Sequence, residues 1–162
     1  MSRTLVAYFS CSGITEKLAR TLAEVVGGEL YRIEPAVPYT DADLNWHNPQ
    51  SRSSLEMRDK TSRPAISGRV ADMEQYDTVY VGFPIWWYVA PTIINTFLES
   101  HDFSGKTVIP FATSGSSGVG ETDRWLHSSC SAQTRWRPAR RFPGNAGVAE
   151  LREWVDGLKL ER

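Results

Sequence analysis

Hydrophobic and polar positions along the chain alternate between short apolar runs and longer amphipathic segments. Continuous apolar runs, typical of buried strands, are TLVAYF (4–9), the first part of DTVYVGFPIW (77–86) and KTVIPFAT (106–113). Apolar residues at helical spacing predict helices over 14–26, 91–100, 121–130 and 147–158. Strands and helices therefore alternate along most of the chain.

Weaker signals lie between these elements. ELYRIE (29–34) alternates as a second strand should, directly after Gly27 and Gly28 end the first helix. A poor candidate for a fifth strand lies near TRWRPARRF (134–142), where Pro138 interrupts the run. Strands followed by helices imply an α/β fold with a parallel sheet and helices on both faces. Five strands in this length favour the order 2-1-3-4-5 over a six-stranded dinucleotide-binding sheet.

Residues 35–70 form a long excursion between the second and third strands. The region is rich in Pro, Gly, Ser, Asn and Asp, with only a weak helical patch around 53–60. Long connections of this kind tend to be functional or mobile. Tyr39 and Trp46 within it could fold over a site or cover the edge of the core.

Composition and charge narrow the class of protein. The length of 162 residues, with 41% hydrophobic and 23% charged residues, fits one packed domain over residues 1–162. A net charge of −1 argues against a nucleic-acid partner. No apolar run approaches the ~18 residues of a membrane span, and no signal-peptide pattern is present, so a cytoplasmic protein is expected. Cys11 and Cys130 have no metal-binding spacing and are expected to be free thiols.

An arginine-rich stretch, RWRPARRF (135–142), stands out from this neutral background, with four arginines in eight residues. Such a run usually forms a solvated edge. It could also attract an anionic partner or the phosphate of a pyridine nucleotide.

Three unusual loops follow the first, third and fourth predicted strands: SCSGIT (10–15), PIWWYVAP (84–91) and TSGSSGVG (113–120). The carboxyl ends of parallel strands share one edge of a sheet, so all three loops are expected on the same rim. In sheets of this order, ligands bind at that rim, where the strand order reverses between the first and third strands.

The first loop has the composition of a phosphate site. Ser10, Ser12 and Thr15 offer hydroxyls around Gly13, and a helix starts at once, so backbone N–H groups and the helix dipole can converge on an anion. Simple capping of the helix would use the same residue types. The loop matches neither GxxxxGK[ST] nor GxGxxG, which argues against a nucleoside triphosphate site or a dinucleotide fingerprint.

A cysteine-dependent phosphatase is the alternative that this loop raises, with Cys11 as the nucleophile. Such an enzyme needs an arginine six positions after the cysteine to hold phosphate with two hydrogen bonds. Lys17 stands there instead, followed by Leu18 rather than a hydroxyl residue. The sequence therefore argues against phosphatase chemistry.

The other two loops suggest walls for a planar ligand. Consecutive aromatic residues at a strand end cannot all point into one core, so part of the segment from Pro84 to Tyr88 is expected to line the rim. Glycines among Ser and Thr in the third loop allow its backbone amides to approach a ligand. Amide donors there could stabilise negative charge on a planar ligand.

Taken together, SCSGIT, PIWW and TSGS resemble the flavodoxin-like family, in particular its short FMN-binding branch with a Ser-x-Ser-Gly-x-Thr phosphate loop. The similarity runs from about residue 3 to residue 120 and includes RPAIS at 63–67. The resemblance implies FMN as cofactor, with its phosphate on the first loop and its ring beside the other two. Ile14 stands where the family often has asparagine, which removes one side-chain hydrogen bond. The candidate cofactor residues are Ser10, Ser12, Gly13, Ile14, Thr15, Pro84, Ile85, Trp86, Trp87, Tyr88, Thr113, Ser114, Gly115, Ser116 and Gly118.

Three functions are compatible with such a site. Carrier flavodoxins look strongly acidic, whereas this chain is nearly neutral, so a small FMN-dependent NAD(P)H oxidoreductase that reduces a quinone-like or similar acceptor is favoured. A one-electron carrier and a non-catalytic binding module are the alternatives. The partners would be a small-molecule or protein redox partner, and the chain would be a monomer or homodimer. No residue is assigned a catalytic or metal-binding role, because hydride chemistry belongs to the flavin; His47, His101 and His127 are expected at the surface or in structural contacts.

Overall fold

The computed structural model describes residues 3–11, 13–45, 47–59, 61–86, 89–114, 120, 122–143 and 145–158. Strands and helices alternate through most of this part of the chain. In chain order the elements are β1 (Thr4–Tyr8), α1 (Ile14–Val26), β2 (Glu29–Arg32), α2 (Arg52–Arg58), a 3-10 turn (Met73–Gln75), β3 (Thr78–Pro84), α3 (Thr92–Glu99), β4 (Thr107–Thr113), α4 (Thr122–His127), β5 (Arg135–Trp136), β6 (Arg140–Phe142) and α5 (Val148–Leu158).

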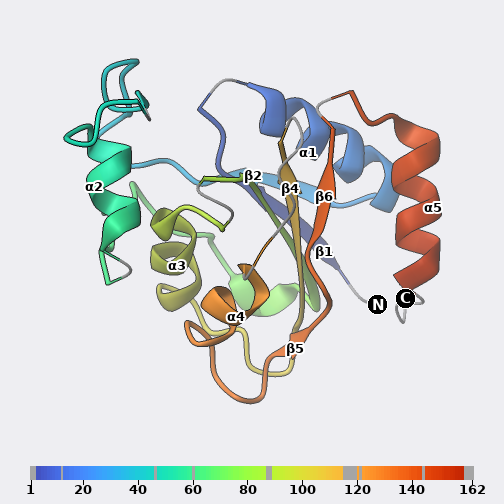
Figure 1. The fold of residues 1–162 in the computed structure, drawn as a ribbon. Helices are drawn as coiled ribbons and strands as arrows, with labels where there is room; N and C mark the ends of the chain where they lie inside the picture. Colours follow the sequence, from blue (N-terminus) through green and yellow to red (C-terminus); the bar gives the residue numbers. More distant parts are fainter. Residues whose placement is uncertain are drawn as a thin grey trace.

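All strand pairs in the sheet are parallel, and its order is β2-β1-β3-β4-β5, with β6 also paired to β4 (Figure 1). This confirms the predicted α/β fold and strand order. The fifth strand differs in one respect, because β5 and β6 are two short pieces separated by Arg137, Pro138 and Ala139. Proline cannot donate to a strand ladder, so the predicted interruption divides the strand.

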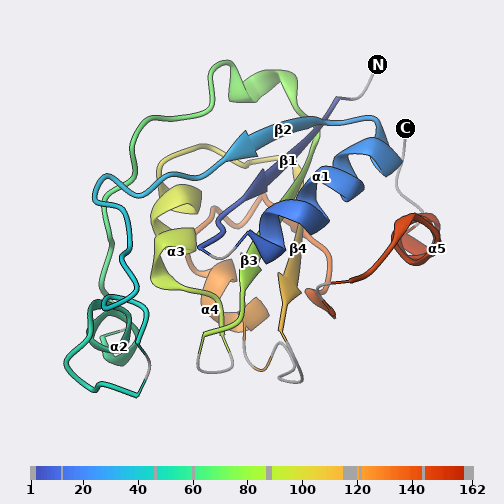
Figure 2. The ribbon, with the colours of Figure 1, turned by 90° about the horizontal axis from the view of Figure 1, so that it is seen from above.

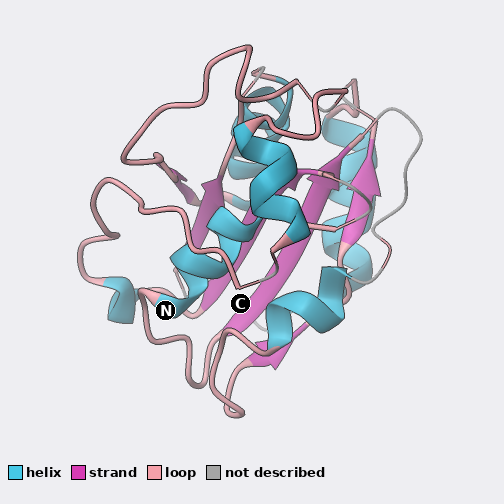
Figure 3. Ribbon diagram, turned by 60° about the vertical axis from the view of Figure 1, so that its left-hand side comes forward, coloured by secondary structure: helices cyan, strands magenta, loops and turns pink. Residues whose placement is uncertain are grey.

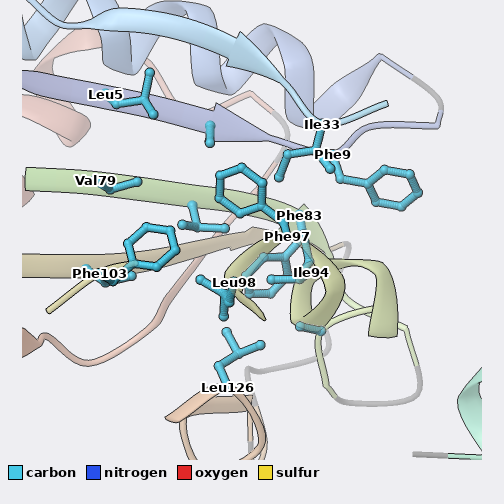
Figure 4. Packing of buried hydrophobic residues seen from close by; sticks show 14 of the residues in the cluster. Leu5, Phe9, Ile33, Val79, Phe83, Ile94, Phe97, Leu98, Phe103 and Leu126 are labelled. Atoms are coloured by element: carbon cyan, nitrogen blue, oxygen red, sulfur yellow. The ribbon is translucent and has the colours of Figure 1, made fainter. Parts of the chain in front are cut away.

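Helices cover the sheet on both sides, giving three layers (Figure 2). One cluster joins residues such as Val6 and Tyr8 to Leu18 and Leu22 of α1 and to Trp154 of α5. The other joins Leu5, Ala7 and Phe9 to side chains of α3 and α4 (Figure 4). Neighbouring residues of β1 thus point to opposite faces, and a central strand buried on both sides reads as the continuous apolar run seen in the sequence. Figure 3 shows the helices packed across the strands.

The excursion over 35–70 is tied to this framework at several points. Pro35 and Ile66 form an antiparallel bridge, so the excursion leaves and returns side by side. The Arg63 guanidinium donates to both carboxylate oxygens of Glu99 on α3, at 2.9 and 3.0 Å. Its helix α2 stands outside the three layers (Figure 2). In the described parts of the chain, no helix is long and apolar enough to cross a bilayer.

His101 follows α3 and holds the returning excursion in place. Its Nε2 accepts a hydrogen bond from the backbone N–H of Val70, and its Nδ1–H donates to the carbonyl of Phe97, both at 3.0 Å. The imidazole must therefore be neutral, because protonated Nε2 could not accept. Burial lowers the pKa of His101, the bond to Phe97 opposes this, and Arg69 lowers the pKa further. The expected structural role of this histidine is confirmed.

The free energy of unfolding is expected to fall as the pH drops from about 7 to about 5. The unfolded chain takes up the His101 proton near its ordinary pKa of 6.5, whereas the folded protein resists it, so this contribution is complete above pH 6.5 and is lost below it. Urea unfolding at several pH values measures the slope. His101→Gln should flatten it. An unchanged slope in His101→Gln would contradict the assignment.

Candidate functional site

The loop after β1 has the backbone geometry of an anion site. Gly13 is the N-cap of the 13-residue helix α1, with a left-handed φ of 87°, and no side chain caps this end in the part of the chain that is described. The N–H groups of a first helical turn have no acceptor within the helix, and the helix dipole favours negative charge there. Ser10 Oγ accepts from the N–H of Gly13 at 3.1 Å, and Thr15 is buried in the first turn. Ser12 lies outside the described residues.

Glu16, also in the first turn of α1, would repel a phosphate if its charge were unbalanced. One of its oxygens accepts two hydrogen bonds from Arg20, at 3.0 and 3.1 Å. The other accepts from Arg32 at 3.1 Å. Two guanidinium groups therefore offset the carboxylate, and the helix N-terminus keeps its attraction for anions.

Thr113, the last residue of β4, connects the three predicted loops. Its hydroxyl hydrogen-bonds with that of Thr15 at 2.7 Å, and both residues are buried. Its carbonyl accepts from the N–H of Ile85, directly after β3, at 3.1 Å. The loops thus meet at one rim, at the carboxyl ends of β1, β3 and β4, as the strand order requires.

After β3, Trp86 and Val89 form an isolated antiparallel bridge. Trp86 and Val89 exchange backbone hydrogen bonds in both directions, at 3.0 and 3.1 Å, while Trp87 and Tyr88 lie outside the described residues. The Trp86 ring packs edge to face against Phe9 and Tyr39, with ring centroids 5.8 and 5.6 Å apart. Tyr39 comes from the excursion, so the excursion both covers the core edge and contributes to this aromatic cluster.

Tyr39 is itself held by α2. Its hydroxyl donates to Glu56 at 2.5 Å, and the guanidinium of Arg52 lies 3.8 Å above its ring. Arg52 and Glu56 form an ion pair at 2.9 Å. Burial and then the bond to Glu56 raise the pKa of Tyr39, so its hydroxyl stays protonated. The sequence had suggested Tyr39 and Trp46 for such a position, and Trp46 lies outside the described residues. Phe9 was not indicated by the sequence, and contacts between distant segments bring it into the aromatic cluster.

Of the third loop, the structure describes Thr113, Ser114 and Gly120. Ser114 follows Thr113, and its N–H donates to the carbonyl of Phe142 on β6 at 3.4 Å. Arg141 donates to both the hydroxyl and the carbonyl of Ser114. Gly115, Ser116 and Gly118 lie outside the described residues, so their assignment stays a prediction.

A pocket of about 210 Å³ opens beside the first loop, between Ser10 and Cys11 on one side and the start of the excursion on the other. Both cysteines are free thiols, as predicted. Although Cys11 is exposed, desolvation by the surrounding protein raises the pKa of its thiol to about 11, against the opposing charges of Arg32 and Arg52. A thiol with so high a pKa is a poor nucleophile at neutral pH, which adds to the case against a phosphatase.

Comparison with known protein families identifies the family of this chain. Residues 3–158 match the flavodoxin family model. The chain belongs to the flavodoxin family. The match extends past residue 120, where the resemblance seen in the sequence ends, and includes β5, β6 and α5. Membership of the family confirms FMN as the cofactor that the sequence predicted. No curated protein matches the chain.

Solved structures of this kind include a protein from Bacteroides eggerthii assigned as a flavoprotein. It is 45% identical, with a TM-score of 0.93, over 99% of this chain and 100% of that one. A flavoprotein in complex with FMN from Lactobacillus acidophilus is 21% identical, with a TM-score of 0.70, over 96% and 99% of the two chains. An NADH:FMN oxidoreductase in its apo form is 18% identical, with a TM-score of 0.58, over 99% and 91%. The last two similarities concern the fold.

The described residues fit the flavodoxin cofactor. Among the described residues no side chain caps the N-terminus of α1, so this helix start suits a phosphate, and a side chain in place of the left-handed Gly13 would be strained. The buried hydroxyls of Ser10 and Thr15 flank it, and the partly buried ring of Trp86 lies at the same rim, packed against Phe9. The helix start and the hydroxyls are suited to the phosphate, and the aromatic residue is suited to the ring.

Proposed function

We propose that this protein is a small FMN-dependent oxidoreductase that passes electrons from NAD(P)H to a quinone-like or similar acceptor. Loop 10–15 holds the FMN phosphate, and residues 84–88 and 113–118 flank the ring. Bound FMN supplies the electron-transfer chemistry. The protein binds and orients the cofactor and keeps the ring at a rim that a second ligand can reach.

The observation that carries this proposal is the junction at Thr113. One residue hydrogen-bonds to the proposed phosphate loop through Thr15 and to the proposed ring-binding loop through Ile85. To bind the phosphate and the ring of one cofactor at the same time, the two loops must be held at a fixed distance from each other. The fold similarity to an NADH:FMN oxidoreductase is consistent with this arrangement.

The charge of the chain favours a reductase over a carrier. A strongly acidic surface disfavours a doubly reduced, negatively charged flavin by repulsion, and the net charge of −1 imposes little of this. Near the rim, Arg141 adds positive charge at Ser114. Two-electron reduction is therefore the expected mode.

Anaerobic reduction of the FMN-loaded protein tests the proposal. NADH or NADPH should bleach the flavin absorbance in one two-electron step, and the reduced protein should then reduce a soluble quinone. Two well-separated one-electron steps, with no reaction toward nicotinamides, would identify a carrier instead. If added FMN keeps its full fluorescence in the presence of protein, the chain would be a binding module without flavin. The proposed cytoplasmic location and the monomeric or dimeric state stay predictions.

A further inference from the structure

Arg141 makes a two-point contact with the first residue of the third loop. Its Nε donates to Ser114 Oγ at 3.0 Å, and its Nη2 donates to the Ser114 carbonyl at 2.8 Å. The side chain is half-buried, and its strand position is set by pairing between Ala112 of β4 and Arg141 of β6. A planar guanidinium held at two atoms has a fixed position and a permanent positive charge.

The position of Ser114 places this charge at the proposed flavin site. Ser114 directly follows Thr113, which contacts both the first loop and the start of the second. The preceding residue, Arg140, has a different environment. Its guanidinium lies 5.1 Å from the ring centroid of Phe142, and it lines a groove with Glu150 and Trp154 of α5. Adjacent strand residues point to opposite faces of the sheet. Arg140 therefore points toward α5, whereas Arg141 points to the other face and contacts Ser114 at the rim.

We propose that Arg141 raises the reduction potential of FMN bound at this rim through its positive charge, which its two hydrogen bonds to Ser114 hold in place. The proposal rests on the proposed function. Two-electron reduction at neutral pH adds net negative charge to the ring. A positive charge nearby stabilises the reduced form more than the oxidised form, and partial burial of the guanidinium reduces screening by water. Within the arginine-rich stretch, Arg141 is thus the residue that affects the cofactor.

Variants with and without the charge test the proposal. Arg141→Gln should reduce the ratio of reduced to oxidised FMN affinity about tenfold, equivalent to about 30 mV for a two-electron couple. Arg141→Lys keeps the charge and should retain most of the potential. Arg140→Gln removes the same charge from the neighbouring residue and should leave the potential within error. The midpoint potential is measured against reference dyes, and thermal unfolding shows whether each variant is folded.

Each other outcome overturns the proposal. Equal shifts in Arg141→Gln and Arg141→Lys would mean that the geometry of Ser114, and not the charge, sets the potential. If Arg141→Gln weakens FMN binding but leaves the potential unchanged, Arg141 contributes to phosphate binding or to the structure of the loop. In both cases the proposed function stands, because FMN still binds and is reduced. Failure of the unaltered protein to bind FMN would instead overturn the proposed function together with this inference.

Discussion

Replacement of Ser12 and Thr15 together by alanine is expected to weaken FMN binding by at least about a hundredfold. A hydrogen bond to a charged group contributes about 1.5–3 kcal/mol, and the double variant removes two such donors from the proposed phosphate site. A hydroxyl can accept one hydrogen bond while it donates another, so Thr15 can bond to Thr113 and to a phosphate oxygen at once. Riboflavin lacks the phosphate, so its affinity should change little.

Fluorescence titration with FMN and riboflavin measures this selectivity. Thr113→Val is the matched control, because it removes the 2.7 Å hydrogen bond to Thr15 and leaves both loop hydroxyls in place. It should affect the two flavins to a similar, smaller extent. Equal weakening of FMN and riboflavin by the Ser12 and Thr15 double variant would show that the phosphate lies elsewhere.

Gly82→Ala is expected to destabilise the protein by about 3 kcal/mol through overpacking. Gly82 lies on the central strand β3 directly opposite Phe111 of β4, and a methyl group there would lie 2.2 Å from Phe111 Cζ. The Phe111 ring is fully buried and packs against Trp154, so it cannot move aside without disturbing that contact. Urea unfolding gives the difference in free energy.

Two further variants separate this clash from general effects of replacing glycine. Gly147 precedes α5, and a methyl group added there meets nothing within 4 Å. Gly147→Ala should therefore change the free energy of unfolding by no more than about 0.5 kcal/mol. Phe111→Leu should make room for the methyl group. The double variant Gly82→Ala and Phe111→Leu should then lose less stability than the sum of the losses in the two single variants. Additive losses would exclude the clash as the cause.

Local patterns were sufficient to predict the framework of this protein. The helix over 14–26 has the predicted bounds because its apolar face is continuous and Gly27, in a left-handed conformation, ends it. Strand order followed from the number and sequence of the elements. The second strand is two residues shorter than predicted, and Tyr31 alone among its residues is half-buried. Its position at the sheet edge explains this, because an edge strand lacks neighbours that would extend its ladder and cover its side chains.

Contacts between distant segments could not be predicted in the same way. Arg141 and Ser114 are 27 residues apart, and nothing in an arginine-rich run distinguishes the arginine that faces the rim from the one that faces α5. The register of the short strand β6 decides it. Similarly, the contact of Tyr39 with Trp86 depends on how a long loop returns to the sheet. Such positions are set by tertiary packing, for which a single sequence carries no periodic signal.

The division of the last strand into β5 and β6 also bears on association between copies of the protein. A long, flat edge strand presents a row of free N–H and C=O groups to which another chain can add. Here Pro138 has no N–H, and the N–H of Ala139 is already bonded to the carboxylate of Asp123, at 2.9 Å to its Oδ1. Arg135 and Arg140 add exposed charge on either side. This edge therefore offers no continuous template to which a strand of another copy could add.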